Sequence, residues 1–215
     1  MSRVDLSELE AWARCELDRK NAAREEVLRW SRELVRACAT SIRAVHRREL
    51  EVAEQRLSEA RELNARIADT LVDLADIYWT GYVQDAQKEL VEACATYALV
   101  TGGRLPDPRQ LGVAPAPFLN GLAEAVGELR RYVLDLLRRG ELDRCEAILG
   151  AMDDIYSLLV TIDYPDALTG GLRRTTDSTR GILEKTRGDL TLALRQEALG
   201  EALRLAERTL ADRPR

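Results

Sequence analysis

Apolar residues recur at helical spacing over almost the whole first half of the chain. The pattern begins near Asp5 and continues to about Val100, with Gly81 as the only glycine and with no proline. This predicts long helices, with a break near Ala65 where the apolar stripe changes phase. Helices of this length cannot bury their apolar faces on one small core. We therefore expect them to pack along other long helices, from the same chain or from copies of it.

Gly- and Pro-rich segments divide the second half. Residues 101–117 contain three glycines and four prolines, which end the first helical region. Gly140 and the turn at 163–171 are further positions at which helices are predicted to end. The remaining sequence predicts helices at about 118–139, 141–162 and 172–211. No strand pattern or internal repeat is visible, so the predicted fold is all-α, an elongated multi-helix bundle in a single domain spanning 1–215.

Charge and composition exclude several classes of protein. The chain has 215 residues and a net charge of −5, which excludes a uniformly basic nucleic-acid binder. Its 32 Lys and Arg residues can still form a local basic surface. The N-terminus has no apolar leader run and no stretch is long enough to span a membrane. We therefore expect a cytoplasmic protein with no membrane association.

The histidine and cysteine content excludes further chemistry. His46 is the only histidine and the four cysteines form no CxxC pair, so a Cys/His zinc site is excluded. His46 is interpreted as a mid-helix residue among arginines, which leaves no Ser/His/Asp or Cys/His set. The Gly170-Gly171 pair lacks the rest of a Walker-type phosphate loop. The Glu-x-x-His pairs of helical di-iron proteins are also absent.

Two acidic pairs are the main candidates for a functional site. Glu89 and Glu92 lie three residues apart, and Glu124 and Glu128 lie four apart. Each spacing places both carboxylates on one helix face. Four carboxylates from two packed helices can hold a hard cation such as Mg²⁺ or Mn²⁺, which prefers oxygen ligands.

Solvated helix faces are the alternative explanation for both pairs. Glu89 lies inside the edge of an apolar stripe and Glu92 on its flank, and a carboxylate on an apolar face is unfavourable unless it is paired or bound to metal. Glu124 and Glu128 lie opposite the apolar stripe of their helix. Periodicity alone therefore predicts that the second pair is solvated, unless that face lines a cavity or an interface between subunits.

Basic and aromatic side chains are candidates for nucleic-acid contact. The basic candidates are Arg43 and Arg47 in the first helix and Arg173 and Arg174 after the Gly pair. Arginine binds phosphates through paired hydrogen bonds. Alternatively, these arginines pair with nearby acids such as Glu49 or Asp177. Trp79 and Tyr82 are able to stack on bases, but their helical spacing favours a place in the core.

Several segments resemble the translin/Trax family. The similar segments are residues 24–47, QKELVEACA at 87–95, GLAEAVGELRR at 121–131, and 155–190. They are distributed from residue 24 to residue 190, so the resemblance extends over most of the chain. The sequence is most similar to archaeal members and to the Trax-like ribonuclease branch.

The resemblance implies a fold of about seven helices and a hollow shell of eight subunits that binds single-stranded RNA or DNA. It also implies Mg²⁺-dependent cleavage of RNA. By position, the residues that would hold Mg²⁺ (or Mn²⁺) and act in catalysis are Glu89, Glu92, Glu124 and Glu128. Glu124 stands where Trax has Asp, so its side chain is one methylene longer.

Three alternatives remain open. A translin-like protein would form the same shell and bind nucleic acid without cleaving it. An all-α nucleotide pyrophosphohydrolase would also hold Mg²⁺ through a Glu-x-x-Glu helix and a second acidic helix, but would give the long N-terminal helices no role. A structural coiled coil is disfavoured by the Pro-rich segment.

Overall fold

The all-α prediction is confirmed. The computed structural model describes residues 5–211, which contain helices and no strand. These helices are α1 Ser7–His46, α2 Leu50–Thr70, α3 Ala75–Tyr78, α4 Gly81–Thr101, α5 Pro108–Leu111, α6 Pro115–Leu137, α7 Leu142–Val160, α8 Asp166–Thr169 and α9 Leu172–Ala211. The resemblance implied about seven helices. The described residues form nine, of which α3, α5 and α8 are turns of four residues.

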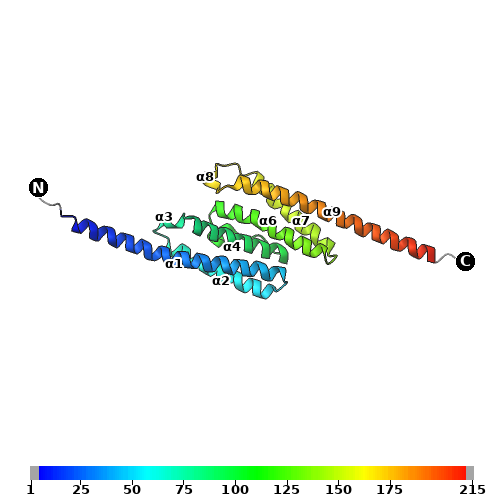
Figure 1. Ribbon diagram of the computed structural model, residues 1–215, viewed down its shortest axis with the longest axis horizontal. Coiled ribbons are helices and arrows are strands. Elements are labelled where there is room, and N and C mark those ends of the chain that lie inside the picture. The colour runs from blue at the N-terminus through cyan, green and yellow to red at the C-terminus, as the bar shows by residue number, and fades with distance from the viewer. Residues whose placement is uncertain (1–4, 212–215) are drawn as a thin grey trace.

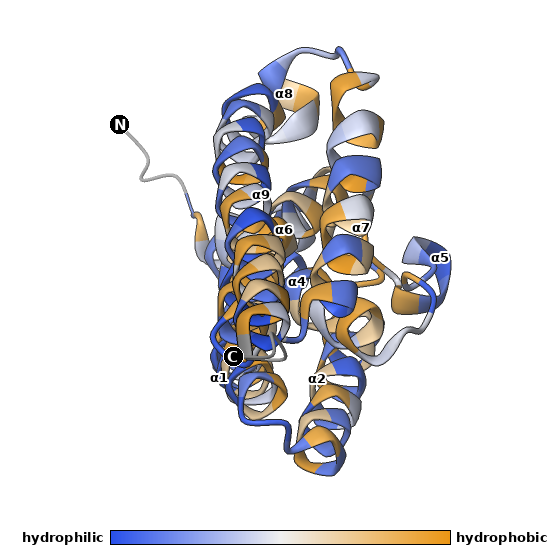
Figure 2. Cartoon of the chain, turned by 90° about the vertical axis from the view of Figure 1, so that its right-hand side faces the viewer, coloured by the Kyte–Doolittle hydropathy of each residue, from blue (hydrophilic) through white to orange (hydrophobic). Residues whose placement is uncertain are grey.

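The long helices pack in three layers (Figure 1). The α1–α2 hairpin forms one side, α4 and α6 lie in the middle, and α7 and α9 form the other side. Hydrophobic and hydrophilic residues alternate in bands along the helices, as expected of amphipathic helices (Figure 2). The middle helices contact both neighbouring layers and bury many side chains, among them Leu90 and Val91 of α4 and Leu122 and Leu129 of α6.

The first predicted break was misplaced. The chain turns between His46 and Leu50, and α2 then continues through Ala65 to Thr70. Arg48 has a φ of 64°, and its N–H donates to the Val45 carbonyl at 2.9 Å. Because a non-glycine residue occupies this left-handed position, the turn has no Gly or Pro signal.

The later boundaries agree closely with the sequence. Proline occupies the first turn of α6, where its missing N–H costs no hydrogen bond. Gly140 has a φ of 75° between α6 and α7. The turn at 163–171 contains the short α8, and α9 spans Leu172–Ala211 as predicted. The predicted 1–215 domain also includes 1–4 and 212–215, which lie outside the described residues.

Gly121 sets the distance between the two central helices. A Cβ at this position would lie 2.5 Å from the Lys88 carbonyl oxygen and 2.7 Å from the Val91 Cβ. Both distances are shorter than van der Waals contact, so only glycine permits this approach. Glu124 follows one turn later on α6, and Glu89 follows Lys88 on α4. The close approach therefore brings the acidic segments of both helices together.

The two 40-residue helices extend beyond the bundle at opposite ends (Figure 1). Their projecting parts, which we call the terminal arms, are residues 7–19 of α1 and 191–210 of α9. Large apolar side chains are exposed on both arms, among them Trp12, Leu17, Leu199 and Leu203. Within residues 5–211, no helix combines the length and the hydrophobicity needed to cross a membrane.

Candidate functional site

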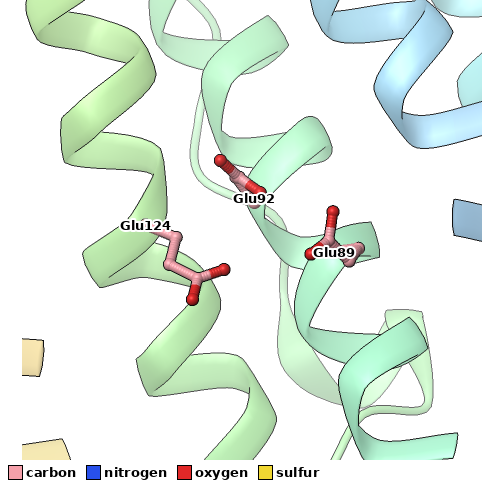
Figure 3. Close-up of side chains that lie close together, drawn as sticks. All are labelled: Glu89, Glu92 and Glu124. Atoms are coloured by element: carbon pink, nitrogen blue, oxygen red, sulfur yellow. The ribbon is translucent and has the colours of Figure 1, made fainter. Parts of the chain in front are cut away.

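Three of the four predicted carboxylates meet between α4 and α6. One carboxylate oxygen from each of Glu89, Glu92 and Glu124 lies within 4.8 Å of the other two. Glu89 and Glu92 project from α4, and Glu124 extends from α6 toward them (Figure 3). All three side chains are partly buried. We call this group the carboxylate cluster.

Burial and mutual repulsion oppose ionisation of the cluster. Burial, together with the charges of Glu89, Glu124 and Glu128, raises the pKa of Glu92 from 4.5 to about 8. Burial also raises the pKa of Glu89, while Lys88 acts in the opposite direction. Three crowded carboxylates are unfavourable as anions unless a cation offsets their repulsion. Their oxygen donors fit a hard divalent cation such as Mg²⁺ or Mn²⁺.

Lys88 is a cation in direct contact with the cluster. Its Nζ donates a hydrogen bond to Glu124 Oε1 at 2.8 Å. The Lys88 and Glu124 side chains are 24% and 35% exposed, so this ion pair lies on the solvent-accessible side of the cluster. A phosphate that approached the cluster would therefore meet an ammonium group beside the carboxylates.

Glu128 lies next to the cluster but has different partners. His46 Nε2–H donates to Glu128 Oε2 at 2.5 Å, and Arg131 Nη1 lies 3.7 Å from the same oxygen. The hydrogen bond from His46 lowers the pKa of Glu128. Glu128 is thus satisfied within the fold, whereas the three cluster carboxylates crowd one another.

The sequence-based interpretation of His46 was wrong. His46 is the last residue of α1, and its side chain is 5% exposed and faces Glu128. Its Nδ1 is buried and has no hydrogen-bond partner among the described residues. The available signal was the place of His46 near the end of segment 24–47, which resembles the translin/Trax family.

The expectation that Glu124 and Glu128 lie on a solvated face was also wrong. Glu124 faces α4 and Glu128 faces the end of α1, and both are partly buried within one chain. The reason is that α6 is a central helix, with α4, α7 and α9 packed around it. Its main apolar stripe identifies only one of its buried faces.

The predicted basic residues do not form one group. Arg43 donates to Thr40 Oγ1 at 3.0 Å, and Arg47 Nη1 lies 4.0 Å from Glu49 Oε2, so the pairing with Glu49 is present. At the start of α9, Arg173 Nη2 lies 3.4 Å from Asp163 Oδ1 in a highly exposed pair. Arg174 instead lines a cleft next to the cluster.

This cleft lies between the start of α4, the start of α6 and the α8–α9 corner. Lys88 and Glu124 line it on the side of the carboxylate cluster, and Trp79, Leu168 and Arg174 are among the other lining residues. Trp79 is 63% exposed, so the prediction that it belongs to the core was wrong. Tyr82 is partly buried and packs against the core.

Known proteins share both the fold and the sequence. The chain is 38% identical to AfC3PO, with a TM-score of 0.81 and with 88% of this chain and 98% of that chain covered. A structure of an AfC3PO–duplex RNA complex matches with the same identity and TM-score, over 97% of that chain. Apo-NeC3PO matches at 20% identity with a TM-score of 0.77 over 90% of this chain and 99% of its own, which shows the shared fold alone.

A sequence relative supports the same assignment. An uncharacterized protein of Methanocaldococcus jannaschii is 33% identical over 190 residues, which cover 87% of this chain and 84% of the relative. No family model matches the chain. The identities above 30% over most of both chains nevertheless establish the family, in agreement with the resemblance seen in the sequence. The chain belongs to the translin/C3PO family.

Proposed function

We propose that the protein is a Mg²⁺-dependent endoribonuclease that acts on single-stranded RNA. The observation that carries this proposal is the carboxylate cluster, in which three acidic side chains from two helices lie within 4.8 Å of one another. The solved complex of AfC3PO with duplex RNA supports RNA as the substrate class. Single-stranded DNA, which carries the same backbone charge, is the second ligand that we propose.

Each residue of the site has a distinct task in this proposal. Glu89, Glu92 and Glu124 hold Mg²⁺ or Mn²⁺ through carboxylate oxygens. When bound, the ion supplies Lewis-acid stabilisation of a phosphodiester oxygen and makes a bound water more acidic. Lys88 offers its ammonium group to the phosphate. His46 keeps Glu128 ionised and fixed beside the cluster. The negative charge of Glu128 adds to the electrostatic repulsion that a bound cation would offset.

We also propose that copies of the chain assemble into the hollow shell of eight subunits implied by the family resemblance. The apolar side chains of the terminal arms, such as Trp12 at 67% and Leu203 at 57% exposure, would be covered by neighbouring copies. Light scattering at micromolar concentration should give a mass far above that of a dimer. A monomer mass of 24.1 kDa would contradict the assembly.

One experiment separates cleavage from binding. The purified protein is incubated with end-labelled single-stranded RNA, and separately with nucleoside triphosphates, each with Mg²⁺ and with EDTA. We expect internal cleavage of RNA with Mg²⁺ and none with EDTA. RNA that is bound but stays intact with Mg²⁺ would favour the non-catalytic translin-like alternative. Hydrolysis of the triphosphates alone would restore the pyrophosphohydrolase alternative.

A further inference from the structure

The cleft next to the carboxylate cluster combines the aromatic ring of Trp79 with the guanidinium group of Arg174. We propose that this cleft binds one unpaired nucleotide of the RNA, adjacent to the phosphate at the cluster, with the base stacked on Trp79 and a phosphate on Arg174. The proposal rests on the proposed function, because it names a subsite of the same substrate. Four observations carry it.

The first observation is that Trp79 is exposed and yet held in place. Its ring meets the ring of Tyr78 edge to face, with centroids 5.0 Å apart and an interplanar angle of 88°. Tyr78 is in turn anchored to α4, since Gln84 Nε2 donates to its carbonyl at 2.9 Å and Gln87 Nε2 to its hydroxyl at 3.3 Å. An exposed aromatic ring with a fixed orientation stacks on a base at little entropic cost.

The second observation is the difference between the two neighbouring arginines of α9. Arg173 points to another side of the corner, where it pairs with Asp163. Arg174 lines the cleft and has no carboxylate partner within 4.0 Å among residues 5–211. Its guanidinium therefore remains available for a phosphate, to which it is able to donate two parallel hydrogen bonds.

The third observation is that the wall carrying Arg174 is fixed to α6. Thr175 Oγ1 donates to Asn120 Oδ1 at 2.9 Å, and Asn120 Nδ2 donates to the Thr169 carbonyl at 2.8 Å. Asn120 is 7% exposed. These bonds hold the α8–α9 corner against α6, one turn before Glu124. The distance between Arg174 and the cluster is therefore set by the fold before RNA arrives.

The fourth observation is that the cleft and the cluster are continuous. Glu124 belongs to both, and Lys88, which lines the cleft, donates a hydrogen bond to Glu124. The cleft contains two cations, Lys88 and Arg174, and two carboxylates, Asp85 and Glu124. This balance fits a single phosphate with its base better than a run of phosphates. Inside a duplex, both faces of a base are covered by its stacked neighbours, whereas an unpaired nucleotide is able to leave the stack and offer a face to Trp79.

The test measures RNA affinity in EDTA, where cleavage cannot interfere. Wild type, Trp79→Ala and Trp79→Phe are titrated with a fluorescent single-stranded RNA and with a blunt-ended duplex of the same sequence. We expect Trp79→Ala to weaken single-strand binding about tenfold, or about 1.4 kcal/mol, and to leave duplex binding unchanged. Trp79→Phe should retain most of the affinity, because it keeps a ring.

Arg174→Ala and Arg173→Ala form a matched pair for the phosphate. Both arginines are exposed in the same turn of α9, so both variants should fold alike. We expect Arg174→Ala to weaken single-strand binding about tenfold and Arg173→Ala to weaken it less than twofold. Cleavage with Mg²⁺ should show a raised KM for Arg174→Ala.

Two outcomes would overturn the inference. One is a Trp79→Ala protein that binds single strands as wild type does, or loses affinity equally for duplex. The other is an equal effect of the two arginine substitutions. In both cases wild-type binding and cleavage would leave the proposed function intact. A wild-type protein that binds no RNA would overturn the function and the subsite together. If Trp79→Ala fails to fold, the arginine pair still decides the question.

Discussion

The acidic pairs of α4 and α6 look alike in the sequence but differ in the structure. Glu89 and Glu92 both join the carboxylate cluster. On α6, Glu124 joins the cluster, but Glu128 turns to His46 at the end of α1. The i,i+3 and i,i+4 spacings place each pair on one helix face. The helix that faces each carboxylate then determines its role.

The charges around the two pairs differ accordingly. The α4 carboxylates have raised pKa values, since burial and neighbouring carboxylates disfavour their anionic forms. Glu128 has a lowered pKa, because His46 donates a hydrogen bond to it. A cation is therefore needed at the α4 pair and not at Glu128. This difference predicts which substitutions affect metal binding and which do not.

Removing a charge from the α4 pair should have the largest effect. Gln keeps the shape of Glu89 or Glu92 but removes one hard anionic ligand. We expect either Glu89→Gln or Glu92→Gln to slow Mg²⁺-dependent cleavage about 100-fold, or about 2.7 kcal/mol, while RNA binding in EDTA persists. Single-turnover cleavage over a range of Mg²⁺ concentrations measures this. Glu184→Gln, in an exposed pair with Arg180, is the control. Full cleavage by both cluster variants would refute the site.

Moving α4 away from α6 should separate the two pairs without changing any charge. In Gly121→Ala, the new Cβ would meet the Lys88 carbonyl at 2.5 Å, so the helices must shift apart. We expect a loss of about 1–3 kcal/mol in the free energy of unfolding, together with weaker metal binding. Denaturant unfolding and Mg²⁺ titration measure both.

The same helix supplies a control for the glycine substitution. At Gly127 of α6, a Cβ would meet no atom of residues 5–211 within 4 Å apart from its own turn of helix. Gly127→Ala should therefore be neutral, or stabilising by up to about 1 kcal/mol through helix propensity. Equal effects of the two substitutions would show that close approach at Gly121 is not what positions the cluster.

Glu128 should contribute less than the α4 pair. Glu128→Gln removes a charge beside the cluster but no ligand of the three that lie within 4.8 Å. We expect about a tenfold loss of cleavage, corresponding to about 1.4 kcal/mol, with a nearly unchanged Mg²⁺ concentration at half-maximal rate. Isothermal titration with Mn²⁺ measures metal affinity directly. A loss of metal affinity as large as that of Glu92→Gln would make Glu128 a fourth ligand.

Much of this arrangement was predictable, and particular residues explain the rest. The boundaries of α6, α7 and α9 followed from prolines, glycines and periodicity. The acidic spacing gave four candidate carboxylates, and the family resemblance, not the periodicity, pointed to Glu124 as a partner of the α4 pair. The turn at Arg48 carried no glycine. The role of His46 depends on a partner 82 residues away. Trp79 follows the helical spacing of core residues but lies at the end of the short α3, where the chain leaves the helix. Local patterns do not record such long-range contacts.

The pH dependence of stability should distinguish the pairs without any RNA. Below about pH 4.5, Glu92 is protonated in both the folded and the unfolded chain. Between its ordinary pKa of 4.5 and its folded pKa of about 8, the unfolded chain binds fewer protons, so stability falls as pH rises. We expect the metal-free Tm to decrease from pH 5 to pH 8, and the decrease to be smaller in Glu92→Gln. Saturating Mg²⁺ should also make the decrease in the Tm of the wild-type protein smaller. An identical pH profile for wild type and Glu92→Gln would contradict the raised pKa.

The smallest effect is expected where this chain departs from the Trax pattern. Glu124 stands at a position where the family resemblance implies Asp, and the longer side chain of Glu allows two sets of contacts. It reaches the oxygens of Glu89 and Glu92, and it accepts a hydrogen bond from Lys88 at 2.8 Å. Glu124→Asp keeps the charge but withdraws the carboxylate by one methylene toward α6. The central helices are fixed by Gly121, so they cannot close the gap. We expect cleavage to fall about threefold, or about 0.7 kcal/mol, with a higher Mg²⁺ requirement. Glu124→Gln is the matched control, because it keeps the length and removes the charge, and it should lose far more. Faster cleavage by Glu124→Asp would show that the longer side chain hinders the metal, and that the contact with Lys88 does not adapt the site to Glu.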